Sequence, residues 1–383
     1  MYKDIIGLDN CYGCGVCSAV CPVEIIRFTP DDQGFYRPSV VEGYKCIDCG
    51  YSNGSCAALS QEVALGNKAV AVYAGWTEDK QTLRSTSSGG IGYELARAFT
   101  AKGGVSCGVR YDAAAGKAEH YVARTPHEAE RSKDSKYMQS DSPVGFREAL
   151  AQKGHTMISG TPCQVASLRR YLRLRGMEEK FLLVDIFCFG VPSLNLWKKY
   201  LAQHEDTLGT ADGVTFRDKA KGWHDSWRIR GTHGGKTVYF SEREDLFYKF
   251  FLRRYVQLMP CYTCPFRREN SAADIRLGDM WGDKYAENHD GVSITVAMTE
   301  KGWAALQNIE GITLRPETIE TAIEGQLKKE QPVPSVRGKL LQELDGPLSL
   351  EQTDKKYRLP LYAWRLGFRI KRRVKRLWLR NKK

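Results

Sequence analysis

A run of four closely spaced cysteines near the N-terminus carries the clearest chemistry in this sequence. The run reads Cys11-Tyr-Gly-Cys14-Gly-Val-Cys17-Ser-Ala-Val-Cys21-Pro, which is a C-x2-C-x2-C-x3-C-P spacing. With this spacing, three thiolates wrap one iron–sulfur cluster and the fourth cysteine reaches a second cluster. The alternatives are a zinc site or a disulfide staple. Zinc usually takes two spaced pairs of ligands, so a single run of four cysteines favours a cluster.

A second run completes the pair, except at one position. It reads Cys46-Ile-Asp-Cys49-Gly-Tyr-Ser52-Asn-Gly-Ser-Cys56-Ala, so Ser52 stands where a third cysteine is expected. Serine is a harder and poorer iron ligand than thiolate. The second cluster is therefore expected as a three-iron [3Fe-4S] cluster, a Ser52-ligated cluster or a labile site, and the remaining alternative is that it is lost. The ligands expected from the cross-over are Cys11, Cys14, Cys17 and Cys56 for the first cluster, and Cys21, Cys46 and Cys49 for the second.

Four further cysteines lie at turns and at the ends of apolar stretches. Cys163 follows a Gly-Thr-Pro turn, and Cys188 lies near the end of an apolar stretch. Cys261 and Cys264 form a C-x2-C pair before a proline. Cysteines so placed can converge on one more cluster, whereas buried cysteines also serve as small hydrophobic residues. The spacing alone leaves these two interpretations equal.

The composition is typical of a globular protein in a reducing compartment. Of 383 residues, 42% are hydrophobic and 27% are charged, and no apolar stretch approaches the length of a membrane span. Lys3, Asp4 and an early cysteine run do not fit a signal peptide. Twelve cysteines in these spacings indicate the cytoplasm, where clusters and thiols persist.

The net charge of +12 is concentrated at the C-terminus. Residues 355–383 contain thirteen Lys and Arg and no Asp or Glu, so the rest of the chain is close to neutral. A neutral body argues against nucleic acid as a partner. A basic amphipathic helix with an interfacial Trp is attracted to an anionic membrane surface, and the alternatives are an acidic protein partner or a solvated helix. The apolar positions that recur at helical spacing after Pro360 are Leu366, Ile370, Val374, Leu377 and Trp378.

The pattern along the chain predicts three parts. Residues 1–67 are expected to form a small two-cluster, ferredoxin-like domain with two extended stretches around a Gly-containing turn, and residues 351–383 form the basic tail. Residues 68–350 alternate between strand-like and helix-like stretches, which predicts a mixed body of the α/β or α+β class. The expected strands are 68–76, 105–110, 120–123, 156–159, 181–189, 214–217, 227–230, 237–240 and 292–298, and the expected helices are 91–101, 143–151, 164–175, 193–204, 242–258 and 301–309.

Several stretches of the body carry a resemblance to a known family. On these stretches the chain resembles the coenzyme F420 (deazaflavin) hydrogenase/dehydrogenase beta-subunit family over about residues 68–300, and the ferredoxin-like N-terminal part suits its longer members. The stretches are Ser85-Thr-Ser-Ser-Gly-Gly90, Ser135-Lys-Tyr-Met-Gln-Ser140, Ser159-Gly-Thr-Pro-Cys-Gln164, Asp185-Ile-Phe-Cys-Phe-Gly-Val-Pro-Ser193, Phe216-Arg-Asp-Lys219, and Cys261-Tyr-Thr-Cys-Pro265 running on to Ala273-Asp-Ile-Arg-Leu-Gly-Asp-Met-Trp-Gly282.

The resemblance implies that the body binds FAD and one [4Fe-4S] cluster. The cluster ligands that match the family are Cys163, Cys188, Cys261 and Cys264. The flavin is expected at the Ser-Gly-Gly turn before a helix, where backbone N–H groups suit a pyrophosphate, and at the 135–140 stretch. The residues that the resemblance assigns to the flavin are Ser87, Ser88, Gly89, Gly90, Ser135, Lys136, Tyr137, Gln139 and Ser140.

Catalytic residues are not defined by the sequence, and the candidates are Lys136, Arg217 and Lys219. For Lys136 the plain alternative is a solvated charge. Arg217 and Lys219 can clamp an anionic substrate, and the alternative for them is a surface salt-bridge pair.

The expected function is that of a cytoplasmic iron–sulfur flavoprotein oxidoreductase, held close to the inner face of the membrane by its tail. Electrons from a ferredoxin-like donor would pass through up to three clusters to FAD and on to an organic substrate, with surface-polysaccharide biosynthesis as the expected setting. Flavin is the needed converter, because clusters move single electrons and organic reductions take two. The alternatives are a beta subunit that reduces or oxidises a deazaflavin coenzyme in a hydrogenase or dehydrogenase complex, and a non-catalytic protein with structural clusters.

Overall fold

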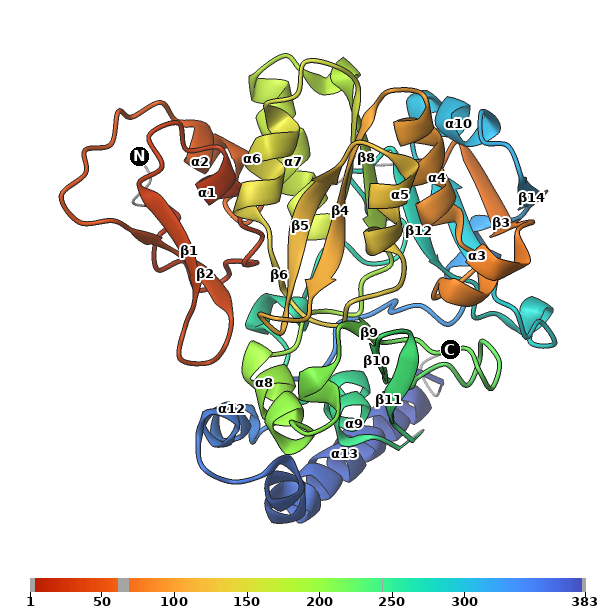
Figure 1. Cartoon of the computed structure of the whole chain (residues 1–383). Coiled ribbons are helices and arrows are strands. Elements are labelled where there is room, and N and C mark those ends of the chain that lie inside the picture. The colour runs from red at the N-terminus through yellow and green to blue at the C-terminus, as the bar shows by residue number, and fades with distance from the viewer. Residues whose placement is uncertain (1–3, 61–68, 243, 381–383) are drawn as a thin grey trace.

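Figure 1 shows the computed structural model of the chain, which describes residues 4–60, 69–242 and 244–380. A small cysteine-rich module lies beside a large central sheet, and a layer of helices with a small sheet lies along one end of that sheet. The domain boundary expected between residues 67 and 68 lies outside the described residues, and so does the start of the strand expected at 68–76.

The body is built on a nine-stranded mixed sheet with the order β14-β3-β13-β12-β8-β7-β4-β5-β6. The neighbours β12, β8, β7 and β4 run parallel, whereas β13, β3 and β14 on one side and β5 on the other pair antiparallel. This topology confirms the mixed α/β class. The strands are β3 (Ala71–Thr77), β4 (Val105–Asp112), β5 (Lys117–Ala123), β6 (Ser140–Asp141), β7 (Thr156–Ser159), β8 (Phe181–Ile186), β12 (Ile275–Asp279), β13 (Ser293–Ala297) and β14 (Ile312–Pro316).

Helices cover both faces of this sheet, as its buried strands require. In β8, Phe181 and Leu183 pack with α6 and α7, whereas Leu182 and Val184 pack with α4 and α10 on the other face. Successive side chains of a strand point to opposite faces, so a strand covered on both sides is apolar along most of its length. The helices around the sheet are α3 (Lys80–Ser85), α4 (Ile91–Ala101), α5 (Pro126–Ala129), α6 (Pro143–Leu150), α7 (Pro162–Leu174), α10 (Glu300–Gln307) and α11 (Ile319–Ala322).

The N-terminal module contains two copies of one small unit. Each cysteine run leads into a short helix that begins after a glycine in the left-handed conformation, Gly15 (φ 77°) before α1 and Gly50 (φ 75°) before α2. Between the two units, β1 and β2 pair as an antiparallel hairpin, as the Gly-containing turn predicts. The elements are α1 (Val16–Ala19), β1 (Ile26–Pro30), β2 (Tyr36–Val40) and α2 (Tyr51–Ser55).

Buried polar side chains fix this module against the body. The Gln139 amide donates to the backbone oxygen of Gly13 (2.8 Å) and accepts from the backbone N–H of Tyr36 (2.8 Å). The Ser142 hydroxyl donates to the backbone oxygen of Cys14 (2.9 Å). Because these partners include backbone groups of the first cysteine run, the body helps to set the conformation of that run.

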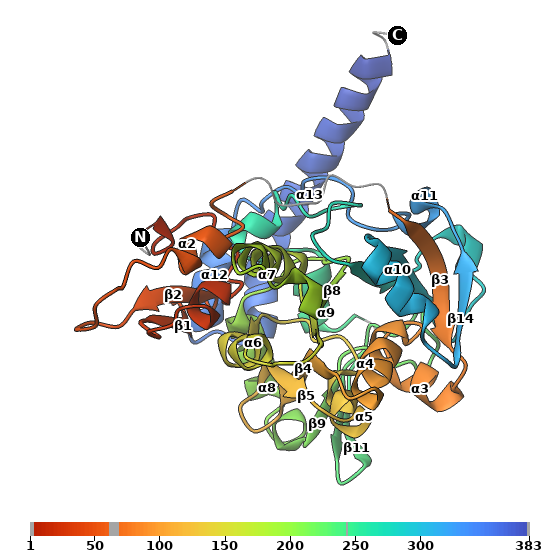
Figure 2. The same cartoon turned by 90° about the horizontal axis from the view of Figure 1, so that it is seen from above.

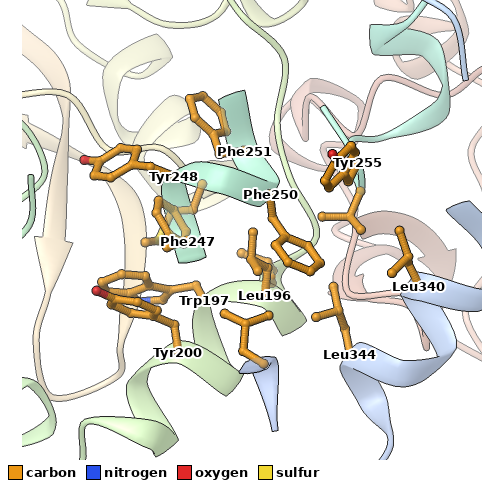
Figure 3. Packing of buried hydrophobic residues seen from close by; sticks show 14 of the residues in the cluster. Leu196, Trp197, Tyr200, Phe247, Tyr248, Phe250, Phe251, Tyr255, Leu340 and Leu344 are labelled. Carbon is orange, nitrogen blue, oxygen red and sulfur yellow. The ribbon is translucent and has the colours of Figure 1, made fainter. Parts of the chain in front are cut away.

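Below the sheet in Figure 1, helices and a three-stranded sheet enclose an aromatic core. Figure 3 shows Trp197 and Tyr200 of α8 close to Phe247 of α9, and Leu340 and Leu344 of α12 on the other side of this core. The elements of this layer are α8 (Leu194–Gln203), β9 (Gly213–Thr215), β10 (Arg230–His233), β11 (Lys236–Phe240), α9 (Leu246–Leu252), α12 (Arg337–Asp345) and the first turns of α13 (Leu350–Arg380).

Helix α13 is longer than the helix expected after Pro360. Its first turns pack into the aromatic core through Leu350, Tyr357 and Leu361, which explains why the helix begins before the proline. Pro360 lies inside the helix, although proline lacks the N–H of a helical hydrogen bond. Figure 2 shows that the C-terminal part of α13 projects beyond the rest of the molecule. Within the described chain, no helix is both long and apolar enough to cross a membrane.

Several other elements differ from the expectation for local reasons. The strand expected at 181–189 ends at Ile186, so Cys188 lies in the following loop. The helix expected at 242–258 is confined to α9, because the Asp245 carboxylate caps its start and Arg254 takes a left-handed conformation (φ 57°) after its end. The strand expected at 227–230 lies three residues later in β10, since pairing with β9 and β11 begins at Arg230.

Candidate functional site

A cavity of about 570 Å³ lies at the carboxyl ends of the central parallel strands. It is lined by Ser159 and Gly160 where β7 ends, by Phe187 and Cys188 after β8, and by Asp279 at the end of β12. Parallel strands end at the same edge of a sheet, and ligands of open α/β sheets bind in the crevice outside these ends. The volume is within the range of small-molecule and cofactor sites.

The Ser-Gly-Gly turn borders this cavity at the start of α4. Ser87, Ser88 and Gly90 line the cavity, whereas Gly89 lies behind it, where an added Cβ would be 2.1 Å from a backbone oxygen of β3. Gly90 is left-handed (φ 84°) and precedes the first turn of α4. The two serine hydroxyls already donate within the protein, to a carboxylate and to a backbone oxygen. The donors that this turn has available for an anion are therefore the backbone N–H groups at the start of α4.

The 135–140 stretch runs along the same cavity. Ser135, Lys136, Tyr137 and Ser140 line it, whereas the Gln139 side chain points to the N-terminal module. Burial lowers the pKa of the Lys136 ammonium to about 8. This ammonium donates to three backbone oxygens of residues 131–134, so Lys136 closes a backbone turn beside the cavity.

The four cysteines of the body line a second, smaller cavity of about 60 Å³. Burial raises the pKa of the Cys163 thiol well above its usual value, and nearby cysteines, Cys188 and Cys264 among them, raise it further. Burial also raises the pKa of Cys188 to about 12 and that of Cys261 to about 11. We call this group of Cys163, Cys188, Cys261 and Cys264 the body quartet.

Three segments that are distant in sequence contribute to the body quartet, and two of them are joined directly. A bridge between Pro192 and Gln257 sets the loop after β8 beside the segment that leads to Cys261. Gly190 packs so closely that an added Cβ would lie 3.0 Å from the Cβ of Cys261. The N–H of Gly190 also donates to the Sγ of Cys188 (3.3 Å), and hydrogen bonds of this kind orient and tune thiolate ligands.

The body quartet fits an iron–sulfur cluster better than a single metal ion. Among the described residues, no three side chains of cysteine, histidine, aspartate or glutamate stand close enough to hold one ion. A cubane binds each thiolate at a different iron, so its ligands stand further apart than those of one ion. Four thiols around one small cavity, with a backbone N–H on one sulfur, are compatible with a [4Fe-4S] cluster, and the cluster itself stays a prediction.

Four cysteines of the N-terminal runs also come together. Cys11, Cys14, Cys17 and Cys56 line one small cavity, and we call them the N-terminal quartet. Burial raises the pKa of Cys17 well above its usual value, and the other three cysteines raise it further. The N–H of Gly13 donates to the Sγ of Cys11 (3.4 Å). Gly13 is left-handed (φ 57°) and an added Cβ would collide with the module–body contacts, so glycine is required there.

The residues expected at a second N-terminal cluster are grouped more loosely. Cys21 is buried and packs with half-buried Cys46, whereas Cys49 is exposed. Ser52 is buried, and its hydroxyl donates to the backbone oxygen of Cys17 (3.2 Å). This hydroxyl therefore supports the first run in the structure, and an atypical second cluster stays a prediction.

Lys219, one of the two residues expected at an anionic substrate, is engaged within the protein. Its ammonium donates to the backbone oxygens of Leu83, Ser88 and Asp290 at 2.8, 2.6 and 2.6 Å. Burial lowers the pKa of Lys219 to about 8. Lys219 thus ties the segment before α4 to the loop before β13, beside the large cavity.

Arg217, the other such residue, is buried behind the cavity wall. Its guanidinium lies over the rings of Trp227 and Trp281, 4.3 and 5.2 Å from their centroids. It donates to the hydroxyl of Tyr137 (3.2 Å) and pairs with the carboxylate of Asp279 (3.4 Å). The Nη2 atom has no hydrogen-bond partner among the described residues. Arg217 therefore supports the aromatic wall and places a positive charge beneath it.

This aromatic wall has little sequence signal. Trp227, Phe251 and Trp281 line the large cavity but come from three separate segments that meet only in the fold. Trp281 lies in a family-like stretch, so that motif already marks it. Trp227 and Phe251 stand in no motif, and only the packing of α9 and the loop before β10 against the sheet places them here.

The site combines a cofactor-sized cavity with two cysteine quartets, which is the construction of a redox protein. Residues 154–319 match the family model that describes the C terminus of the coenzyme F420 hydrogenase/dehydrogenase beta chain. This segment contains all four cysteines of the body quartet and Arg217. This match over part of the chain confirms the resemblance to the F420 hydrogenase/dehydrogenase beta-subunit family.

The similar proteins include two from Methanosarcina species. The F component of F420H2 dehydrogenase from Methanosarcina mazei is 24% identical over 197 residues, which are 48% of this chain and 55% of the relative. The chain thus matches about half the length of this curated relative. A chain of the F420-reducing NiFe hydrogenase complex from Methanosarcina barkeri has a TM-score of 0.48 and 18% identity, covering 76% of this chain and 92% of that chain.

Proposed function

We propose that this chain is an electron-transfer subunit in which a flavin in the large cavity exchanges electrons with clusters held by the two quartets. The observation that carries the proposal is the position of Cys188, which lines both the large cavity and the cavity of the body quartet. Toward the N-terminal module, Tyr12 lines both the cavity of the body quartet and that of the N-terminal quartet. The three cavities therefore follow one another from the N-terminal module to the carboxyl edge of the sheet, which is the arrangement that stepwise electron transfer needs.

The two-electron partner that we propose is a deazaflavin coenzyme. Both the family description and the name of the curated relative refer to coenzyme F420. This alternative is therefore better supported than an organic substrate of surface-polysaccharide biosynthesis. A ferredoxin-like carrier remains the proposed single-electron partner at the N-terminal module.

The flavin that we propose is FAD, on the strength of the 85–90 and 135–140 stretches. Bound in the cavity, it would convert between the hydride chemistry of the coenzyme and single electrons. The start of α4 supplies backbone N–H groups for a pyrophosphate. Trp227 and Trp281 supply flat apolar surface for a ring system, and the guanidinium of Arg217, paired with Asp279, stacks beneath them. Arg217 is buried away from water, which strengthens its interactions.

The proposal is tested with the anaerobically purified full-length chain, reconstituted with iron, sulfide and FAD. Reduced coenzyme F420 is expected to reduce the flavin and then the clusters, followed by absorption and by electron paramagnetic resonance. In Cys261→Ala the flavin should still be reduced, whereas electrons should no longer reach the N-terminal quartet. Cys107→Ala is the matched control, because Cys107 is fully buried in β4 and belongs to neither quartet.

Each part of the proposal has its own contradicting outcome. Failure to bind any flavin after reconstitution would overturn the flavin assignment. If reduced coenzyme F420 leaves the bound flavin oxidised, the deazaflavin is not the two-electron partner, and other organic substrates become the candidates. Unchanged transfer in Cys261→Ala would show that electrons do not pass through the body quartet.

For the tail we propose an anionic membrane surface as the partner. Leu359, Tyr362 and Leu366 of α13 are 78%, 66% and 45% exposed, and their spacing places them on one side of the helix. The excess positive charge of the chain lies in the same segment, which projects beyond the body (Figure 2). Exposed apolar residues among Lys and Arg bind the headgroup region of anionic bilayers.

Vesicle co-sedimentation tests this proposal. The full-length chain is compared with a version ending at Ala363, which keeps the buried Leu361, on vesicles with and without phosphatidylglycerol. The full-length chain should bind anionic vesicles much more strongly, because the shorter version keeps Leu359 and Tyr362 but loses Leu366 and ten Lys and Arg. Neutral vesicles should not hold it, and salt should weaken binding. Equal behaviour of the two versions on anionic vesicles would contradict the membrane assignment, and binding to an acidic protein without lipid would replace it.

A further inference from the structure

Helix α7 contacts both cysteine quartets. Cys163 of the body quartet is the second residue of α7, and Ser167 lies one turn later on the same side of the helix. The Oγ of Ser167 is 3.5 Å from the Sγ of Cys14 in the N-terminal quartet. The same Oγ accepts from the backbone N–H of Ala57, the neighbour of Cys56, at 3.2 Å. Ser167 is only 1% exposed, so its hydroxyl serves these two groups rather than water.

The space between the two quartets is packed with apolar side chains. Tyr12 lines the cavities of both quartets, and its ring packs edge-on against Phe266 with a centroid separation of 5.8 Å. Ala57, Ala166 and Ala272 complete this cluster, and all three are nearly fully buried. A hydrogen bond in such dry surroundings is stronger than one in water. Ser167 is therefore well placed to influence the sulfur that it contacts.

We propose that Ser167 is a positioning residue that raises the reduction potential of a cluster in the N-terminal quartet by donating a hydrogen bond to the Cys14 sulfur. The inference rests on the proposed function, since it needs a cluster at this quartet. As a thiol, Cys14 donates to Ser167. As a metal ligand it has lost its proton, so the hydroxyl must become the donor while it continues to accept from Ala57. This requirement sets the direction of the hydrogen bond.

The effect on the potential follows from charge. A donor on a ligand sulfur stabilises the more negative, reduced state, so the potential rises; hydrogen bonds to sulfur are a recognised control of cluster potentials. The step that this potential affects is the transfer of one electron between the clusters of the two quartets. One cluster is oxidised as the other is reduced, and no bond is made or broken. Ser167 thereby sets the driving force of the step between the module and the body.

The test is a redox titration of the full-length, cluster-loaded protein followed by electron paramagnetic resonance. The signal of the N-terminal quartet is identified as the one that remains in Cys261→Ala and is lost in Cys56→Ala, because Cys56 belongs to that quartet alone. Ser167→Ala should keep its iron and show a lower potential for this signal. Ser167→Thr, which keeps a hydroxyl, should stay close to the wild type. Ser241→Ala is the matched control, because Ser241 is also buried and accepts a backbone N–H (2.7 Å) but follows β11 of the small sheet.

The outcomes separate this inference from the proposed function. An unchanged potential in Ser167→Ala with full iron content would overturn the inference and leave the proposed function intact. Loss of iron in Ser167→Ala would also overturn it, because the serine would then support the fold of the quartet. Absence of any cluster from the reconstituted wild type would overturn both.

Discussion

Asp185 and Arg276 form a two-point ion pair that is completely buried between β8 and β12. The Nε and Nη2 atoms of Arg276 donate to the two carboxylate oxygens of Asp185, each at 2.7 Å, and both side chains are 0% exposed. The Nη1 atom donates to the backbone oxygen of Arg268 (2.7 Å). The pair therefore joins the strand that leads to Cys188 with the loop that follows Cys264.

Removal of the arginine from this pair should disrupt the body quartet. Arg276→Met leaves the Asp185 carboxylate buried without its partner, which typically lowers the free energy of unfolding by about 3–5 kcal/mol. The loop after Cys264 also loses its anchor, so the iron content of the body site should fall. Urea unfolding and iron analysis measure both effects. The double variant Asp185→Leu/Arg276→Met should be less destabilised than Arg276→Met, and equal or greater destabilisation would contradict this explanation.

Gln139 should act at the module–body contact rather than at the flavin. Gln139→Leu keeps the volume but leaves the N–H of Tyr36 and the backbone oxygen of Gly13 unpaired, which should cost about 2 kcal/mol or more. Limited proteolysis should then cleave the N-terminal module more quickly, while flavin affinity changes little. Gln152→Leu, which removes one hydrogen bond at the end of α6, is the control. A large loss of flavin affinity in Gln139→Leu would refute this assignment.

Lys219 should prove to be a structural residue of the cavity rim. Lys219→Met leaves three backbone oxygens without their shared donor, so stability should fall by on the order of 2 kcal/mol. Flavin should also dissociate more readily, because the Ser88 turn is no longer held. Exposed Lys221 provides the control as Lys221→Met. If Lys219→Met keeps its stability and changes only the KM of an anionic substrate, the substrate-clamp interpretation is correct instead.

His120 should make the stability of the chain depend on pH. Burial lowers the pKa of His120 to about 4, so the folded chain keeps this ring neutral where the unfolded chain takes up a proton near pH 6.5. The contribution of His120 to the free energy of unfolding therefore has its full value above pH 6.5 and decreases as the pH falls toward 4. Between pH 7 and pH 5 the loss should be about 2 kcal/mol.

Urea unfolding of the metal-free chain at pH 7 and pH 5 measures this loss. His120→Phe, which suits the contact with Phe146, should remove it, whereas exposed His127→Gln should not. An equal pH dependence of the wild type and His120→Phe would show that other groups are responsible.

The grouping of the N-terminal quartet could be predicted because most of its cysteines are close together in the sequence. Three of its cysteines lie in one short run, and the glycines between them allow the tight turns that bring the sulfurs together. The body quartet could not be predicted from spacing alone. Cys163 and Cys188 follow parallel strands, but Cys261 reaches them only through the bridge between Pro192 and Gln257, which is a property of the fold.

The roles of charged and polar residues were harder to predict than their positions. Arg217, Lys219 and Gln139 all lie at or near the site, yet the first two are engaged by the protein itself and the third faces the module. A sequence motif marks a position without saying which way its side chain points. The same holds for Ser167, which stands in no motif and becomes notable only because α7 passes between the two quartets.

The most direct test of the central claim is the iron and flavin content of the full-length chain, purified without oxygen and reconstituted. The cavity, the body quartet and the N-terminal quartet predict one FAD and at least two clusters per chain, seen by electron paramagnetic resonance as separate signals. Cys261→Ala should lose the iron of one cluster and keep its flavin, whereas Cys107→Ala should match the wild type. A wild-type chain with neither iron nor flavin, or a Cys261→Ala variant with unchanged iron, would contradict the claim.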